Sequence, residues 1–278
     1  MKRFVVILML TMIAPIALQS QTRSRARTNG ILLADLTWVE AEKVLTSETL
    51  VVIPLGAEAK EHGPHLKLKN DWLMAEYLKA RVLEQADVVI APTLNYNFYP
   101  AFLEYPGSTS LRLETARDVV VDICRSLAHY GPRRFYIINT GVSTLAALKP
   151  AAEMLAGDGI VLRYTDILKI MEPVEKAVSK QEGGTHADEL ETSMMLVMAP
   201  ASVDMKKAVK DYHASRGRGG LTRNPNGNGV YSASGIWGDP TLATLEKGKK
   251  LTAALVVGVL REIEDLRRTA LTERQPKQ

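Results

Sequence analysis

VVIPLGAEAKEHGPHLKLKNDWL, residues 51–73, is the stretch around which the rest of the chain is organised. Its first five residues are apolar and rich in β-branched side chains, which predicts a short buried strand that ends at Gly56. Five side chains with nitrogen or oxygen donors follow within sixteen residues: Glu58, Glu61, His62, His65 and Asp71. Donors of these types suit a divalent ion such as zinc or manganese, so the stretch predicts a metal site.

A solvated loop would also explain any one of these charged residues. The cluster favours a functional site, because Gly63 and Pro64 fix the backbone between its two histidines. It also lies just past the carboxyl end of the predicted strand, where open α/β sheets bind their ligands. His65 is either a further ligand or a residue that holds the loop by hydrogen bonds, and the second reading is favoured.

Helical and strand patterns alternate through the chain. Thr37 and Glu40 form a capping box that predicts the start of a helix before the central strand. Further helices are expected at 72–84, 112–130 and 144–156, and further strands at 87–91, 134–138 and 159–164. Strands that alternate with helices predict a three-layer αβα fold with a mostly parallel central sheet.

A second group of polar residues lies in GGTHADELETSMML, residues 183–196. His186 comes just before a predicted helix that carries Glu189 and Glu191 in its first turn. Acidic residues in a first turn also interact favourably with the helix dipole and stabilise the helix, which is a sufficient structural explanation for one of the two glutamates. The dipole does not explain His186, and a site role is expected for His186 and Glu189.

Two long connections are expected near the site. Residues 92–110 are rich in aromatic side chains and form either a functional loop or a packed surface loop or subunit contact. Residues 211–238 are rich in Gly, Asn, Ser and Arg and predict a long loop. Asp239 and Pro240 are then expected to begin a last helix that runs to about residue 268.

Several of these segments resemble the creatininase (creatinine amidohydrolase) family. The resemblance rests on PLG followed by HGPHL and an Asp nine residues after the first His, and on four further segments: YPGSTSL (105–111), RDVVVDICRSLAHYGPRRFYIIN (117–139), THADELETSMML (185–196) and SGIWGDPTLATLEKGKK (234–250). It covers about residues 34–266. It implies a metal-dependent hydrolase of cyclic or linear amides with two metal ions, and a homo-oligomer.

The chain departs from that family pattern at three places. Lys60 stands where the family has a metal-binding Glu, and Val142 stands about where it has a metal-binding His. Tyr99 and Phe102 align with a family Ser and His. Because two expected ligands are missing, we expect one zinc or manganese ion per chain rather than two.

The resemblance and the donor types together suggest residue roles. Glu61, His62 and Asp71 are the expected metal ligands, with Glu58 as the alternative glutamate. His186 and Glu189 are the expected catalytic residues, and the expected substrate-binding residues are Tyr99, Phe102, Tyr231 and Trp237. The predicted function is hydrolysis of an amide C–N bond in a small molecule; the alternatives are a metal-free binding protein on the same fold and a single-metal lactone hydrolase.

Composition places the chain among ordinary globular proteins, with 46% hydrophobic and 24% charged residues. Residues 1–20 have the basic start and short apolar run of a signal peptide, which predicts a periplasmic or secreted protein without a stable membrane span. An uncleaved anchor is the alternative. Residues 21–33 are expected to be a flexible leader, 34–268 one domain and 269–278 a tail.

Charge and motifs exclude other classes of partner. Loss of Lys2 and Arg3 with the signal peptide lowers the formal charge from +4 to +2, so no nucleic-acid partner is expected. No glycine-rich phosphate loop or dinucleotide motif is present. The single cysteine, Cys124, lies on the predicted core face of its helix, where it can form no internal disulfide.

Overall fold

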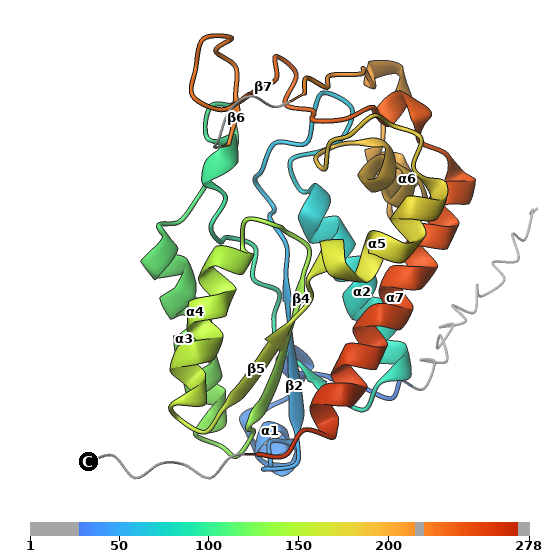
Figure 1. Ribbon diagram of the computed structural model, residues 1–278. Helices are drawn as coiled ribbons and strands as arrows, with labels where there is room; N and C mark the ends of the chain where they lie inside the picture. Colours follow the sequence, from blue (N-terminus) through green and yellow to red (C-terminus); the bar gives the residue numbers. More distant parts are fainter. Residues whose placement is uncertain (1–27, 215–219, 272–278) are drawn as a thin grey trace, which may run out of the picture.

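The structure, a computed structural model, describes residues 28–214 and 220–271, which form three layers (Figure 1). The central sheet is parallel throughout, with strand order β1-β3-β2-β4-β5. Its strands are β1 (Ile31–Leu32), β2 (Leu50–Leu55), β3 (Val89–Ile90), β4 (Arg134–Asn139) and β5 (Val161–Tyr164). The predicted three-layer αβα fold is confirmed.

Helices cover both faces of this sheet (Figure 1). One outer layer contains α3 (Leu113–Ala128) and α4 (Leu145–Ala156). The other contains α2 (Asn70–Gln85), α5 (Ile167–Val178), α6 (Glu189–Met198) and α7 (Leu245–Arg267). Cys124 is fully buried in the first layer, as its helical position predicts.

Strand β2 lies in the middle of the sheet, and both of its faces are buried. Leu50 and Val52 pack in the core under α2, α6 and α7, whereas Val51 and Ile53 pack in the core under α3 and α4. All six of its residues are buried, and it pairs along its whole length with β4. A strand buried on both faces reads as a continuous apolar run, which is the pattern in the sequence.

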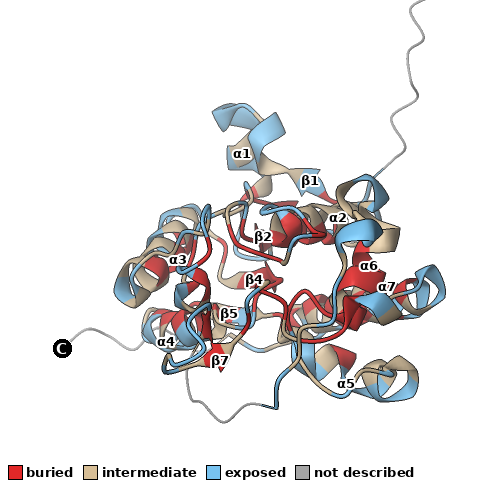
Figure 2. Cartoon of the chain, turned by 90° about the horizontal axis from the view of Figure 1, so that it is seen from above, coloured by how far each residue is buried: buried red, intermediate tan, exposed pale blue. Residues whose placement is uncertain are grey.

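The capping box at the start of α1 (Trp38–Val44) is present. The Thr37 side chain accepts a hydrogen bond from the backbone N–H of Glu40, and the Glu40 carboxylate accepts one from the Thr37 N–H at 2.8 Å. None of the residues of α1 is buried, and the helix projects from the body of the molecule (Figure 2). Trp38 is 78% exposed on it.

The structure differs from the sequence analysis in three elements. Helix α5 was not predicted, although Asp166 caps it and Ile167, Ile170 and Met171 recur at helical spacing. Strand β1 lies in the segment expected to be a leader. Asp239 and Pro240 begin only a short 3-10 turn, and α7 starts later because the Thr244 side chain caps it.

Long loops gather beyond the carboxyl ends of the strands, at the top of Figure 1. They include a small parallel pair, β6 (Leu221–Thr222) and β7 (Val230–Tyr231). Gly235 has a φ of +84°, and a Cβ there would overlap the carboxylate of Glu61. A Cβ at Gly63 would likewise overlap the side chain of Ile236, so the residues around Gly235 lie against the start of the HGPHL segment. No described helix is long and apolar enough to cross a membrane, and the predicted signal peptide lies outside the described residues.

Candidate active site

A cavity of about 330 Å³ opens beyond the carboxyl ends of β2, β4 and β5. Lys60, Thr140 and Ile167, each from the connection after one of these strands, contribute to its wall. Parallel α/β sheets place their ligands at this edge. The rest of the wall is largely apolar and comes from α5, α6 and the 211–238 loop, including Leu168, Met171, Leu190, Met194, Leu221 and Trp237.

Asp71 is buried at the inner end of this cavity, in the first turn of α2. Its Oδ1 lies 2.7 Å from His62 Nε2, and its Oδ2 lies 2.7 Å from the ammonium nitrogen of Lys60. Gly56 permits this arrangement, because a Cβ there would overlap the backbone carbonyl of Asp71. The turn after β2 can therefore lie directly against the start of α2.

Both ring nitrogens of His62 face acceptors. Its Nδ1 lies 2.9 Å from the carbonyl oxygen of Lys60, and since a carbonyl only accepts, Nδ1 donates. Nε2 faces two carboxylates, Asp71 at 2.7 Å and Glu191 at 3.5 Å. Two carboxylate oxygens, one from the start of α2 and one from α6, therefore meet at this nitrogen.

His186 is held by Glu61. Its Nε2 lies 3.1 Å from both the carbonyl oxygen and the Oε2 of Glu61, and the second Glu61 oxygen accepts from the Gly63 N–H. Glu61 is therefore buried at the site, whereas Glu58 is exposed and bonded to Asn95. The Nε2–H of His186 is used by Glu61, which leaves its Nδ1 as the nitrogen with a free lone pair.

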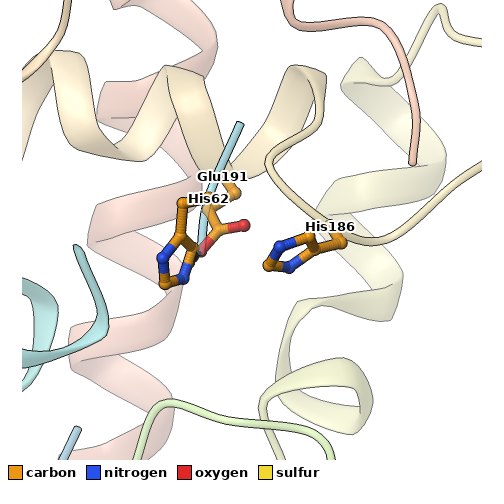
Figure 3. Close-up of side chains that lie close together, drawn as sticks. All are labelled: His62, His186 and Glu191. Atoms are coloured by element: carbon orange, nitrogen blue, oxygen red, sulfur yellow. Dashed lines mark ion pairs between the residues drawn. The ribbon is translucent and has the colours of Figure 1, made fainter. Parts of the chain in front are cut away.

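Glu191 is brought in by the start of α6. The Asp188 side chain accepts from the N–H groups of Leu190 and Glu191 at 3.0 and 2.9 Å, which fixes the first turn. Figure 3 shows that the Glu191 carboxylate then points toward His62 and His186. Donor atoms of these three side chains lie within 4.8 Å of one another.

Charges at the site are strongly coupled. Burial opposes ionisation of Asp71, yet the charges of Lys60 and His62 outweigh it and hold the pKa of Asp71 well below its usual value. Burial also opposes the charge of His62, but Asp71 and Glu191 raise its pKa. For Glu61, burial is outweighed by His186 and the Gly63 N–H, so its pKa is lowered. Asp71 and Glu61 are thus kept ionised.

The expected substrate-binding residues divide into two groups. Phe102 and Trp237 line the cavity, and the Phe102 ring lies 4.5 Å from that of His186. Tyr99 and Tyr231 do not line it: Tyr99 is buried beneath Lys60, and Tyr231 lies beside His213. The buried indole N–H of Trp237 has no hydrogen-bond partner among the described residues.

Glu189 lies away from the cavity wall, contrary to its expected catalytic role. It is fully buried and forms an ion pair with Lys247, and it accepts from the N–H groups of Lys180 and Gln181 at 2.8 and 2.7 Å. The carboxylate of its neighbour Glu191 faces the histidines instead. Both glutamates were candidates from the sequence. The cap at Asp188 sets the start of the helix and is the sequence signal that places Glu189 and Glu191 on different faces of it.

His65 holds the loop rather than facing the ligand group. Its Nε2 lies 2.8 Å from the hydroxyl of Thr192, and its carbonyl accepts from the N–H of Asp204. This is the reading favoured from the sequence. Val142 is 44% exposed at the cavity wall and supplies no donor atom there.

Comparison with known proteins places this geometry in a family. The family model described as creatinine amidohydrolase matches residues 34–263. The chain belongs to the creatininase family. The chain is 28% identical to the creatinine amidohydrolase of Pseudomonas putida over 201 residues, which cover 66% of this chain and 77% of the relative. The family expected from the motifs is confirmed.

Other similar proteins are named for different substrates. The mycofactocin precursor peptide peptidase of Mycobacterium tuberculosis is 26% identical over 230 residues, covering 77% of this chain and 84% of that protein. The 3-dehydro-scyllo-inosose hydrolase of Thermotoga maritima is 23% identical over 268 residues, covering 86% and 85%. These relatives are hydrolases, and the chain is a hydrolase of the same family.

Solved structures agree on the fold. A crystal structure of creatinine amidohydrolase superposes with a TM-score of 0.73 at 24% identity, covering 86% of this chain and 99% of the other. A structure described as "Creatininase Mn" gives 0.72 at the same identity, covering 86% and 100%. At this identity the likeness establishes the shared fold, and the chemistry depends on the residues of this chain.

Proposed function

We propose that this protein hydrolyses an amide C–N bond in a small molecule or short peptide, with one divalent metal ion per chain. The observation that carries the proposal is the convergence of Asp71 and Glu191 on Nε2 of His62 beside a cavity. Relatives named for creatinine and for a precursor peptide support an amide as the substrate class.

The residues present fit a zinc or manganese ion. A catalytic site of this type uses about three nitrogen and oxygen ligands, which His62, Asp71 and Glu191 would supply. Glu191 takes the place expected of Glu61, because Glu61 bonds His186 and Glu191 faces His62. A ligand histidine usually donates its other N–H to a carbonyl or carboxylate, as His62 does to the carbonyl of Lys60. An ion held there would take the place of a proton on His62 Nε2, because ligand nitrogens bind metals in the neutral form.

The bound ion would supply Lewis-acid polarisation and a water of lowered pKa. His186 is suited to carry a proton to the leaving nitrogen, because Glu61 fixes its ring and its Nδ1 is free. A carboxylate that orients the far side of an imidazole is the usual arrangement for such a residue. The largely apolar wall would contact the non-polar part of a substrate.

The test compares metal content with activity in two variants. Zinc binding is measured by calorimetry, and hydrolysis is measured on creatinine and on a panel of short N-acyl peptide amides. His62→Gln should weaken zinc binding at least about 10-fold and abolish hydrolysis. His186→Gln should keep the zinc and lower kcat about 100-fold or more.

Two results would contradict the proposal. Unchanged zinc affinity in His62→Gln would remove the metal site, and loss of zinc in His186→Gln would make His186 a ligand rather than a proton carrier. The exposed His213→Gln serves as the matched control, since this histidine lies outside the cavity wall. It should change neither property.

Export and self-association are also part of the proposal. The signal-like composition of residues 1–20 supports a periplasmic or secreted location, and the family resemblance supports a homo-oligomer. Amino-terminal sequencing of protein recovered from the periplasm should begin after residue 20, and light scattering should give more than one chain per particle. Retention of Met1 or a monomer mass would contradict these two points.

A further inference from the structure

Lys60 is a buried lysine inside the cavity wall. Its side chain is 6% exposed, and its ammonium forms an ion pair with Asp71 Oδ2 at 2.7 Å. The nitrogen also lies 4.7 Å from the ring centre of Phe102 and 5.6 Å from that of Tyr99. Lysine side chains are almost never buried to this extent unless they are paired, because burial of an unpaired charge costs free energy.

Asp71 uses only part of the hydrogen-bonding capacity of Lys60. An ammonium group has three N–H donors, and among the described residues Asp71 is the one carboxylate paired with it. The two rings below it attract its charge but accept no ordinary hydrogen bond. Since Lys60 lines the cavity, its remaining donors are available to a bound molecule.

Asp71 lies between two positive groups. One of its oxygens faces His62 Nε2, where the proposed ion would bind, and the other faces the Lys60 ammonium. A second ion that used Asp71 as a shared ligand would need the position that Lys60 fills, and Val142 offers no donor to it. The residues therefore fit one metal ion and one fixed ammonium, and they do not fit two ions.

We propose that Lys60 is a catalytic residue that binds the carbonyl oxygen of the scissile amide and stabilises the negative charge that develops on it. The inference rests on the proposed amide hydrolysis. It assigns to a protein side chain the electrostatic role that a second cation would otherwise have. Asp71 and the two aromatic rings act as positioning residues that keep the charge in place.

The proposed step balances without any further reactant. The oxygen of a water molecule bonds to the carbonyl carbon while His186 Nδ1 accepts one of the two protons of that water, and the π electron pair moves to the carbonyl oxygen beside Lys60. When the carbonyl re-forms, the C–N bond breaks, and the nitrogen leaves with a proton carried by His186. One amide and one water give one carboxylic acid and one amine, while Lys60 keeps its protons throughout.

The experiment removes the ammonium and then returns it. Lys60→Ala should lower kcat for creatinine or the active peptide amide about 100-fold or more with a smaller change in KM, since the contact strengthens as charge develops. Propylammonium matches the group removed and should restore at least a tenth of the lost kcat. Propanol, which has a similar size and no charge, should not.

Zinc stoichiometry does not depend on activity, and the wild-type value does not depend on any variant folding. Wild-type protein and Lys60→Met should each bind one zinc ion per chain. The exposed Lys67→Met is the matched control and should have wild-type kcat and stoichiometry. If Lys60→Ala does not fold, the wild-type stoichiometry still decides whether Lys60 holds the second position.

The outcomes separate the two claims. Two tight zinc ions in the wild type, a kcat in Lys60→Met within threefold of wild type, or equal rescue by propanol would overturn the role of Lys60 and leave the hydrolase intact. Wild-type protein that hydrolyses none of the amides would overturn the proposed function, and the role of Lys60 with it.

Discussion

Asp71 sets the charge arrangement of the cavity because each of its oxygens has a different positive partner. The aspartate is 1% exposed, so its charge cannot be stabilised by bulk water. Removing one partner from a buried ion pair costs about 3 to 5 kcal/mol, because the remaining charge is left uncompensated. At the scale of single residues, Lys60 therefore supports the fold as well as the proposed reaction.

Glu189 is expected to stabilise the fold rather than take part in catalysis. Glu189→Gln removes the buried charge that pairs with Lys247, and we expect it to lower the free energy of unfolding by about 2 to 3 kcal/mol. Urea unfolding measures this change. Glu172→Gln, which breaks an exposed pair with Lys176, is the control and should cost less than about 0.5 kcal/mol. Loss of zinc or kcat in a stable Glu189→Gln protein would restore its catalytic role.

His65 should make stability depend on pH. Burial lowers the pKa of His65 to about 4, whereas an unfolded histidine titrates near 6.5. Between these values the unfolded state binds the extra proton, so this contribution to stability is present above about pH 6.5 and is lost as pH falls toward 4. His65→Gln should flatten the curve of unfolding free energy against pH over this range. An unchanged slope would show that other groups cause it.

At the scale of elements, the start of α6 delivers a ligand to the site. Asp188 caps the helix, and the residue before it, Ala187, has a φ of +48°, which is unusual for a residue other than glycine. The N–H of Ala187 donates to Glu191 Oε2, and Asn70 donates to Glu191 Oε1, both at 2.8 Å. Strain in the backbone here is offset by bonds that hold the carboxylate in place.

Substitution of Asp188, which caps α6 and is not a proposed ligand, should therefore change the affinity for the metal. Asp188→Ala is expected to destabilise the first turn by about 1 kcal/mol and to weaken zinc binding about 10-fold, because Glu191 loses its fixed position. Asp166→Ala removes the matching cap of α5, which carries no proposed ligand. Calorimetry should give wild-type zinc affinity for that control. Equal affinity in both variants would mean that α6 does not position Glu191.

At the scale of the whole molecule, the fold followed from patterns that do not depend on distant contacts. The apolar run of β2, the capping box at Thr37 and the alternation of helices and strands predicted the αβα layers and the edge of the sheet where His62, Asp71 and His186 meet. Helix α5 was missed although its cap at Asp166 and the helical spacing of its apolar residues were present in the sequence.

The finer arrangement of the site depended on tertiary contacts. Sequence spacing could not show that Glu191 rather than Glu189 faces His62, because the two lie in one helical turn and differ only in the face they occupy. It also could not show that Lys60 folds onto Asp71, since that contact requires the turn at Gly56 to meet α2. The residue types predicted the kind of site, and tertiary packing determines which glutamate and which lysine lie in it.

Asp71 is proposed to be shared by one metal ion and one ammonium. Anomalous diffraction at the zinc absorption edge from zinc-soaked crystals would show this arrangement directly. We expect a single strong peak per chain beside His62 Nε2, in contact with Asp71 and Glu191, with the Lys60 ammonium still on the other oxygen of Asp71. Two peaks flanking Asp71 with Lys60 displaced, or no peak at His62, would contradict it.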